Sequence, residues 1–199
     1  MTHIILASKS IDRKEIFKRI KIDIISISSN IDEEIFKDKI KDPIILVKEL
    51  SKAKIFSVKE KIKEEYLDVL IIAADTIVEL QGELIGKAKD EEDAFRILRK
   101  LAGKTHNIIT GISILKFPEE KLIVDYDQSK VEFLDLSDIE IKDYIQKKEW
   151  IGKAGAYSIR ETASMFIKTI HGSYSNILGL PMQKLYKILN DEFSINLLK

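Results

Sequence analysis

The run Val69-Leu70-Ile71-Ile72-Ala73-Ala74 constrains the fold more than any other part of the sequence. An uninterrupted apolar run of this length predicts a strand that is buried on both faces of a sheet. It is far shorter than the roughly 20 residues that a membrane-spanning helix needs. Strands and helices alternate on either side of it, with no internal repeat and no linker, so the fold class is α/β.

Shorter apolar runs separated by polar joints outline the rest of the fold. Strands are predicted over residues 4–7, 24–27, 83–85, 108–115, 122–136 and about 165–170. Helices are predicted over about 15–20, from Pro43 to about Tyr66, from Asp90 to Gly103, from the capping box Ser137–Glu140 through Ile145, and from Pro181 onward. Residues 28–34 are predicted as a loop rich in oxygen atoms. Gln81-Gly82 is predicted as a hairpin turn, and strands 108–115 and 122–136 are expected to pair.

The composition narrows the class of protein. The 199 residues carry 33 basic and 33 acidic side chains, so no net charge attracts nucleic acid or anionic lipid. The absence of cysteine excludes a disulfide framework, a thiolate nucleophile and a cysteine-ligated zinc site. The first residues predict a strand rather than a signal peptide. We therefore expect a single domain over residues 1–199 in the cytoplasm, with no nucleic-acid partner and no membrane partner.

One polar cluster follows the first predicted strand, at a position where ligands bind in α/β sheets. Ser8, Ser10 and Arg13 offer hydroxyl groups, amides at a helix N-terminus and a guanidinium group, which together could hold a phosphate group. The same pattern is typical of a serine cap on a surface helix. Both interpretations remain open from these residues alone.

A second cluster consists of carboxylates. Asp32-Glu33 lies in the predicted loop, and Asp75 directly follows the buried strand. Such groups can bind Mg²⁺, which takes one or two protein oxygens and keeps waters and substrate oxygens. Asp32-Glu33 also fits a solvated loop, whereas Asp75 needs a partner because a charge beside a buried strand is otherwise costly.

The remaining candidates are cations and a glycine-rich segment. Lys52, Lys87 and Lys153 could neutralise phosphate oxygens, although any single lysine is more often a solvated surface charge. Residues 172–176 and 179–181 could form a backbone anion site before a helix, or only a loop. No P-loop is present, because neither residues 82–88 nor residues 98–105 have the required spacing. His3, His106 and His171 lack the spacing of a zinc site.

Taken in order, these segments resemble the motifs of the Maf family. Residues 6–16 resemble its opening L-A-S-x-S-P-R-R-x-E-L, and residues 74–78 with Gly86-Lys87 resemble A-D-T-V-V and G-K-P. His106 with Thr110-Gly111 resembles H-x-V-x-T-G. Residues 153–159 and 172–181 resemble K-A-G-A-Y-G-I-Q and G-S-Y-x-N-V-x-G-L-P. The resemblance covers essentially the whole chain in the family's order.

The resemblance implies a nucleoside triphosphate pyrophosphatase, closest to the dTTP/UTP pyrophosphatase type. Such enzymes hydrolyse the α–β phosphoanhydride to a nucleoside monophosphate and pyrophosphate with a divalent cation, Mg²⁺ or Mn²⁺. The implied fold is a mixed central sheet flanked by helices, with two lobes around a nucleotide cleft, related to the inosine triphosphatases and often a homodimer. Modified nucleotides are an additional substrate class.

The resemblance also assigns roles to residues. Asp75 is implied as the proton acceptor for the attacking water, and it could also hold the metal together with Glu33. Contacts to the substrate are implied for Ser8, Ser10, Arg13, Lys52, Lys87 and Lys153. Positions that distinguish bases are implied at Asp12, Thr76 and Arg160.

The sequence departs from the family pattern at several of these positions. Ile11-Asp12 replaces Pro-Arg, Ala88 replaces a proline, and Arg160 stands where dTTP/UTP-type members carry glutamine. Asp12 could pair with Arg160, so that the two substitutions compensate each other.

A rival hypothesis is a catalytically silent nucleotide-binding regulator of cell division. The carboxylate Asp75 argues against it, because a protein that only binds nucleotide needs no group to activate water.

Overall fold

The computed structural model describes residues 3–62 and 68–198. Its strands are β1 (His3–Leu6), β2 (Ile25–Ser26), β3 (Val69–Leu80), β4 (Glu83–Ile85), β5 (Thr105–Phe117), β6 (Lys121–Phe133) and β7 (Ile167–His171). They form one sheet in the order β2-β1-β3-β5-β6-β7, and β4 pairs with β3. Strand β1 pairs in parallel with β2 and β3, whereas the β3–β4 and β6–β7 pairs are antiparallel. The predicted mixed sheet is thereby confirmed.

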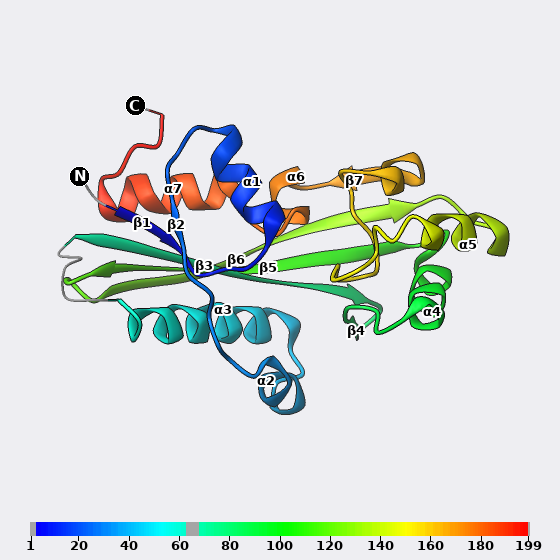
Figure 1. Cartoon of the computed structure of the whole chain (residues 1–199), viewed down its shortest axis with the longest axis horizontal. Coiled ribbons are helices and arrows are strands. Elements are labelled where there is room, and N and C mark those ends of the chain that lie inside the picture. Colours follow the sequence, from blue (N-terminus) through cyan, green and yellow to red (C-terminus); the bar gives the residue numbers. More distant parts are fainter. Residues whose placement is uncertain (1–2, 63–67, 199) are drawn as a thin grey trace. The chain divides into compact units, whose positions relative to one another are not determined.

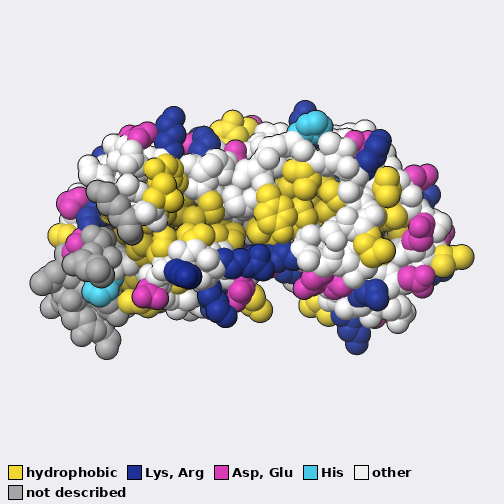
Figure 2. Space-filling model, turned by 90° about the horizontal axis from the view of Figure 1, so that it is seen from above, with side chains coloured by type: hydrophobic (Ala, Val, Ile, Leu, Met, Phe, Trp, Pro, Cys, Tyr) yellow, Lys and Arg dark blue, Asp and Glu magenta, His cyan; other side chains and the backbone are white. Residues whose placement is uncertain are grey.

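Helices flank this sheet, as predicted. They are α1 (Ile11–Arg19), α2 (Glu33–Lys39), α3 (Pro43–Lys59), α4 (Glu91–Leu101), α5 (Asp138–Gln146), α6 (Tyr174–Ile177) and α7 (Met182–Phe193), with a 3-10 turn η1 (Thr162–Met165). Among the described residues, no helix is long and apolar enough to cross a membrane. On the face of the molecule in Figure 2, acidic and basic side chains are interspersed, in line with their equal numbers.

The chain divides into two compact units. Unit 1 takes the described residues of Met1–Asp75, Thr110–Asp127 and Leu178–Lys199, and unit 2 takes Thr76–Ile109 and Gln128–Ile177. Strands β3, β5 and β6 contribute residues to both units. The chain therefore contributes three separate segments to unit 1 and two to unit 2.

In unit 1, helices cover both faces of the sheet. Helix α3 lies on one face, and α1 and α7 lie on the other (Figure 1). Residues of β3 alternate between the two cores: Val69, Ile71 and Ala73 pack on the α3 side, and Leu70, Ile72 and Ala74 pack on the side of α1 and α7. This alternation confirms that the apolar run is a strand buried on both faces.

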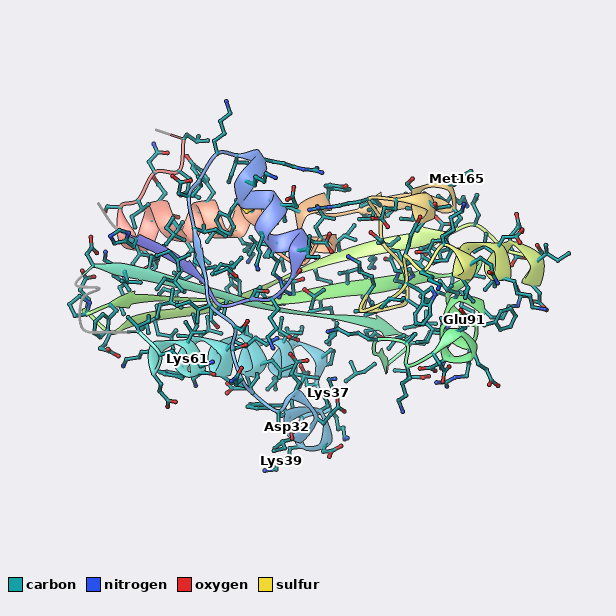
Figure 3. All side chains as sticks on the ribbon, in the orientation of Figure 1. Asp32, Lys37, Lys39, Lys61, Glu91 and Met165 are labelled. Atoms are coloured by element: carbon teal, nitrogen blue, oxygen red, sulfur yellow. The ribbon has the colours of Figure 1, made fainter. Side chains whose placement is uncertain are left out.

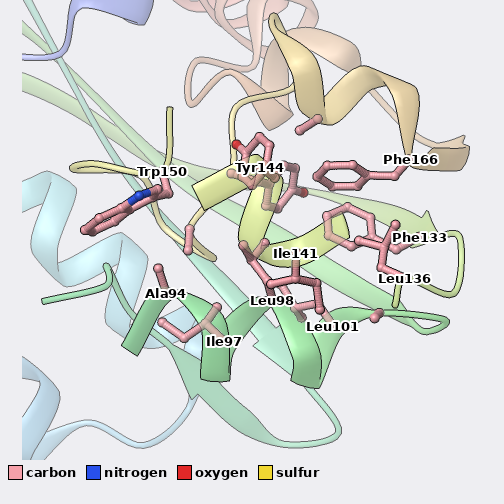
Figure 4. Close-up of a cluster of buried hydrophobic side chains, with 14 of the residues drawn as sticks. Ala94, Ile97, Leu98, Leu101, Phe133, Leu136, Ile141, Tyr144, Trp150 and Phe166 are labelled. Carbon is pink, nitrogen blue, oxygen red and sulfur yellow. The ribbon is translucent and has the colours of Figure 1, made fainter. Parts of the chain in front are cut away.

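Unit 2 has an aromatic core. Helix α4 contributes Ala94, Ile97, Leu98 and Leu101, which Figure 4 shows beside Ile141 and Tyr144 of α5. Phe133 packs edge-to-face on Phe166 with the ring centroids 5.0 Å apart. Such aromatic pairs stabilise a core beyond the area that they bury.

The local signals that were predicted to begin and end the elements of unit 2 are confirmed. The side chain of Asp90 accepts a hydrogen bond from Asp93 N at 2.8 Å, and Gly103 follows the helix with a φ of 68°. Ser137 and Glu140 form the predicted capping box. The turn at Gln81-Gly82 joins β3 to β4, and β5 and β6 are neighbours in the sheet.

Several predicted boundaries were wrong. Residues 28–34 are not all loop, because α2 begins at Glu33. Helix α3 is described to Lys59, and the predicted end near Tyr66 lies outside the described residues. Met165 ends a 3-10 turn instead of starting a strand, and Pro181 precedes the first residue of α7. Helix α2 has no buried residue, so it lacks the apolar periodicity that would have revealed it.

Candidate active site

The first candidate cluster lies at the start of α1 in unit 1. The Ser10 side chain caps this helix and accepts a hydrogen bond from Arg13 N at 3.4 Å. Arg13 is buried, and its guanidinium donates to Ser8 Oγ at 3.2 Å and to the Gly179 carbonyl at 2.6 Å. Ser10 therefore acts as the predicted helix cap, and Ser8 holds the buried guanidinium group of Arg13. A helix cap and a phosphate site are thus compatible in this cluster.

Burial affects the charge of this guanidinium. Desolvation lowers the pKa of Arg13 below its ordinary value, while the negative charges of Asp75 and Glu33 oppose this shift. The ordinary pKa is so high that the side chain stays charged at neutral pH. A charged donor next to the amides of a helix N-terminus is suited to hold an anion such as phosphate.

The carboxylate of Asp75 has the charged partner that the sequence required. Lys54 Nζ, on α3, donates a hydrogen bond to Asp75 Oδ1 and lies 2.7 Å from Glu33 Oε1. Both Lys54 and Asp75 are buried. One ammonium group therefore joins the carboxylates of a strand and a neighbouring helix, and removal of Lys54 would take this cation away from the buried carboxylate of Asp75.

The periodicities of two elements bring these residues together. Asp75 follows Val69, Ile71 and Ala73 on the face of β3 that packs against α3. Lys54 lies four residues after Leu50 and four before Val58, so it shares the buried face of α3. Lys54 is not among the site residues predicted from the sequence. Its place within an apolar stripe was the signal that could have revealed it.

Lys52 was predicted instead, and the structure places it elsewhere. Its ammonium group lies 3.9 Å from Glu49 on the same helix, and its side chain is 41% exposed, against 10% for Lys54. Two residues separate the side chains by more than half a helical turn. The structure therefore brings Lys54 to Asp75, while a contact between Lys52 and substrate stays a prediction.

Asp32 and Glu33, predicted as one acidic pair, have different surroundings. Asp32 is exposed and caps α2, accepting a hydrogen bond from Glu34 N at 3.1 Å. Figure 3 labels Asp32 together with Lys37 and Lys39 of this surface helix. Glu33 points to Lys54. Asp32 is thus a solvated helix cap, whereas Glu33 shares the partner Lys54 with Asp75.

Lys87 and Lys153 lie on two paired segments of unit 2. Lys87 forms an isolated antiparallel bridge with Ala154, and Gly155 N donates to the Gly86 carbonyl at 3.0 Å. Lys87 is exposed and Lys153 is half-buried. Backbone hydrogen bonds between the two segments therefore hold Lys87 and Lys153 near each other in unit 2.

The other predicted positions are divided between the units. Asp12 lies in the first turn of α1 in unit 1, whereas Thr76 and Arg160 belong to unit 2. The proposed pairing of Asp12 with Arg160 stays a prediction.

The small polar residues at 172–176 make hydrogen bonds to neighbouring strands. Ser173 N donates to Ser129 Oγ at 3.0 Å, and Asn176 Nδ2 donates to the Ile108 carbonyl at 3.1 Å. A Cβ added at Gly172 would also stand 2.9 Å from Ser129 Cβ. The segment is therefore anchored closely to β5 and β6.

A buried histidine supports the core of unit 2. His106 Nε2 lies 2.9 Å from Tyr157 Oη, and the two rings pack edge-to-face at 5.5 Å. Burial lowers the pKa of His106 to about 4 and raises that of Tyr157. Both side chains are therefore neutral at pH 7, which is typical of a structural pair rather than of a proton-transfer group.

Among the described residues, the carboxylates of Glu33 and Asp75 are the candidate ligands for a divalent metal. Glu33 and Asp75 both approach Lys54 Nζ, so the ammonium group occupies the position on which these two oxygens converge, and a metal ion would bind beside it. The described residues contain no cluster of three or more histidine or acidic side chains that could hold a metal ion. Mg²⁺ needs only one or two carboxylates when substrate phosphates and waters complete its shell.

Comparison with known proteins shows the family of this chain. A family model described as Maf-like protein matches residues 3–192. A dTTP/UTP pyrophosphatase of Thermoanaerobacter sp. (strain X514) is 40% identical over 195 residues, covering 98% of this chain and 99% of the relative. One from Thermosipho africanus is 43% identical over 193 residues, covering 97% and 95%. One from Dictyoglomus turgidum is 41% identical over 187 residues, covering 94% of each.

A solved structure was also similar, at a much lower level. A nucleoside-triphosphatase, or dITP/XTP pyrophosphatase, from Mycobacterium abscessus aligns with 66% of this chain and 73% of its own. The identity is 10% and the TM-score is 0.33, too low to support a shared fold. The family model and the full-length relatives are sufficient without it, and on their account this chain belongs to the Maf family.

Proposed function

We propose that this protein is a nucleoside triphosphate pyrophosphatase. It hydrolyses the α–β phosphoanhydride of dTTP, UTP or modified nucleotides and releases a nucleoside monophosphate and pyrophosphate. The observation that carries the proposal is the buried contact of Lys54 with both Asp75 and Glu33. Relatives of about 40% identity named dTTP/UTP pyrophosphatase support the substrate class.

Asp75 is the group that activates water in this proposal. Its carboxylate accepts a proton as the water oxygen bonds to phosphorus, and the bond from phosphorus to the bridging oxygen breaks. Lys54 holds the carboxylate in place through its hydrogen bond to Asp75 Oδ1. Hydrolysis of this kind requires positioning and charge neutralisation more than covalent catalysis.

The phosphate chain is bound by cationic and hydroxyl groups. Arg13, Ser8 and Ser10 form one such group at the start of α1, where helix amides add further donors. Lys87 and Lys153 bind phosphate oxygens from unit 2, and Lys52 is a further candidate contact. Asp12, Thr76 and Arg160 distinguish the bases.

A divalent cation, Mg²⁺ or Mn²⁺, is part of the proposal. Glu33 and Asp75 would hold it beside the ammonium group of Lys54, because their contacts with Lys54 bring the two carboxylates close together. The cation would neutralise charge on the phosphate oxygens. Asp75 has two oxygens, so a role as metal ligand and a role as proton acceptor are compatible in one carboxylate.

Release of pyrophosphate tests the proposal directly. The purified protein is assayed with Mg²⁺ or Mn²⁺ against dTTP, UTP, CTP, GTP, ATP and modified pyrimidine nucleotides. We expect turnover with dTTP and UTP. Nucleotide binding without pyrophosphate from any substrate would instead support the regulator of cell division. Homodimer formation and a cytoplasmic location are separate expectations, tested by light scattering and cell fractionation.

A further inference from the structure

The depth at which α3 packs on the sheet is set by one glycine of β5. A Cβ added at Gly111 would overlap the carbonyl group of Val47 and would stand 2.9 Å from Lys48 N. Both neighbours are backbone groups of α3, so no side-chain rotation could relieve the overlap. The φ of Gly111 is not in the left-handed region, so lack of space and not backbone conformation requires glycine here.

A buried hydrogen bond strengthens this contact one turn further along α3. Ser51 Oγ donates to the Lys48 carbonyl at 2.9 Å and lies 2.8 Å from Ser113 Oγ. Because the Ser51 proton is directed to that carbonyl, the Ser113 hydroxyl donates to Ser51. Gly111 and Ser113 are two residues apart, so they share the face of β5 that meets α3.

The same face of α3 carries Lys54. Val47, Ser51, Lys54 and Val58 follow one another at helical spacing and are all buried. Asp75 lies on the α3 face of the adjacent strand β3. The distance from the Lys54 ammonium to Asp75 therefore depends on how closely α3 approaches the sheet.

We propose that Gly111, with Ser113, is a positioning residue that holds α3 close enough for Lys54 to reach Asp75 and Glu33. Nonbonded carbon and oxygen atoms need roughly 3.5 Å, whereas the added Cβ would stand well inside that distance from the Val47 oxygen, so an alanine would displace α3 from β5 by about 1.4 Å. A shift of this size at a catalytic group can cost on the order of 10²-fold in rate. The inference rests on the proposed function, because it extends the machinery assigned there.

The first test needs no nucleotide. Limiting acetic anhydride is added to the nucleotide-free protein, and mass spectrometry measures the modification of Lys54 relative to Lys52. Lys54 is protected in the wild type, since its side chain is 10% exposed, against 41% for Lys52. In Gly111→Ala we expect the Lys54/Lys52 ratio to rise at least about twofold, because α3 opens locally.

A matched control separates positioning from lost stability. Gly103→Ala places the same methyl group in unit 2, where φ is 68° and the nearest atoms are 3.6 Å away. It should lower Tm without changing the labelling ratio or kcat. Ser113→Ala, which removes a hydrogen bond without adding volume, should shift the ratio in the same direction as Gly111→Ala but less. If Gly111→Ala does not fold, Ser113→Ala decides the question by the same ratio.

The second test is a double-mutant cycle on pyrophosphate release. Gly111→Ala should lower kcat on the order of tenfold or more with KM near the wild-type value. In a Lys54→Met background it should cause no further loss, because the residue that it positions is gone. An equal loss in both backgrounds, or an unchanged labelling ratio in folded Gly111→Ala, would overturn the proposal. A wild type without activity would overturn the proposed function, and the labelling result would still stand.

Discussion

Strand β3 carries two buried carboxylates with different surroundings, Asp75 in unit 1 and Glu79 in unit 2. Asp75 is paired with the ammonium group of Lys54. Glu79 accepts hydrogen bonds from neutral donors, the backbone of Gly82 in the hairpin turn and the amide of Asn107. Two carboxylates on one strand can therefore have different roles, because the groups opposite them differ.

The contrast extends to the units around them. Unit 1 buries Arg13 and Lys54 next to carboxylates, an arrangement whose desolvation cost often exceeds its gain in stability. The core of unit 2 has edge-to-face aromatic rings and the neutral pair His106–Tyr157. Buried ions that do not favour stability are typical of sites for chemistry. These surroundings are consistent with the proposed catalytic role of Asp75, and they predict a structural role for Glu79.

The largest effect should come from neutralising each carboxylate in turn. Asp75→Asn should lower kcat by about 10²- to 10⁴-fold, the usual contribution of a proton acceptor, while circular dichroism stays native. Glu79→Gln should leave kcat near the wild-type value and lower the free energy of unfolding by about 1–2 kcal/mol through a weaker turn. Pyrophosphate release and urea unfolding measure both. Near-normal kcat in Asp75→Asn would remove the distinction between the two carboxylates.

The second prediction compares Lys54 and Lys52, two lysines of α3. Lys54→Ala should lower kcat by about 10²- to 10³-fold, as loss of one charged group at a reaction centre does. Lys52→Ala should cost at least tenfold less, since its side chain is half-exposed and bound to Glu49. Initial rates with saturating dTTP make the comparison. A larger loss in Lys52→Ala would show that the buried ion cluster is structural.

The third prediction concerns the neutral pair of unit 2. The pKa of His106 falls from 6.5 when unfolded to about 4 when folded, so between these values the unfolded chain binds more protons. The free energy of unfolding should therefore be highest above pH 6.5, where His106 is neutral in both states. It should decrease by about 3 kcal/mol as the pH falls to 4.

Urea unfolding of the wild type and His106→Gln between pH 4 and pH 7 measures this dependence. The variant should lose most of it, whereas His171→Gln, at an exposed position on β7, should keep it. An unchanged slope in His106→Gln would mean that another group carries the pH dependence.

The smallest effect is on selectivity. Arg160 can only donate hydrogen bonds, so it should favour bases with carbonyl acceptors, and uracil and thymine nucleotides should be the best substrates. Arg160→Gln should discriminate more sharply among dTTP, UTP, CTP and GTP, as judged by kcat/KM. A wild type that prefers a guanine or cytosine nucleotide by tenfold, about 1.4 kcal/mol, would contradict this role.

Local signals were sufficient for much of the framework. The caps at Asp90 and Ser137 and the turn at Gln81-Gly82 depend on residues only a few positions apart, so the sequence predicts them correctly. Helix α2 was not predicted, because it buries no side chain and so shows no apolar periodicity. Its Asp32 cap and its Glu33 therefore looked alike in the sequence, although only Glu33 approaches Lys54.

The sequence by itself determined which chemical groups are available and that Asp75 ends an apolar run and needs a partner. Only the tertiary structure decided that the partner is Lys54. Lys54 is 21 residues from Asp75 in the chain, and the contact depends on the rotation of α3 about its axis and on its depth against Gly111. Lys52 and Lys54 differ little in local sequence. Packing distinguishes them because a helix turns two neighbouring lysines toward different surroundings.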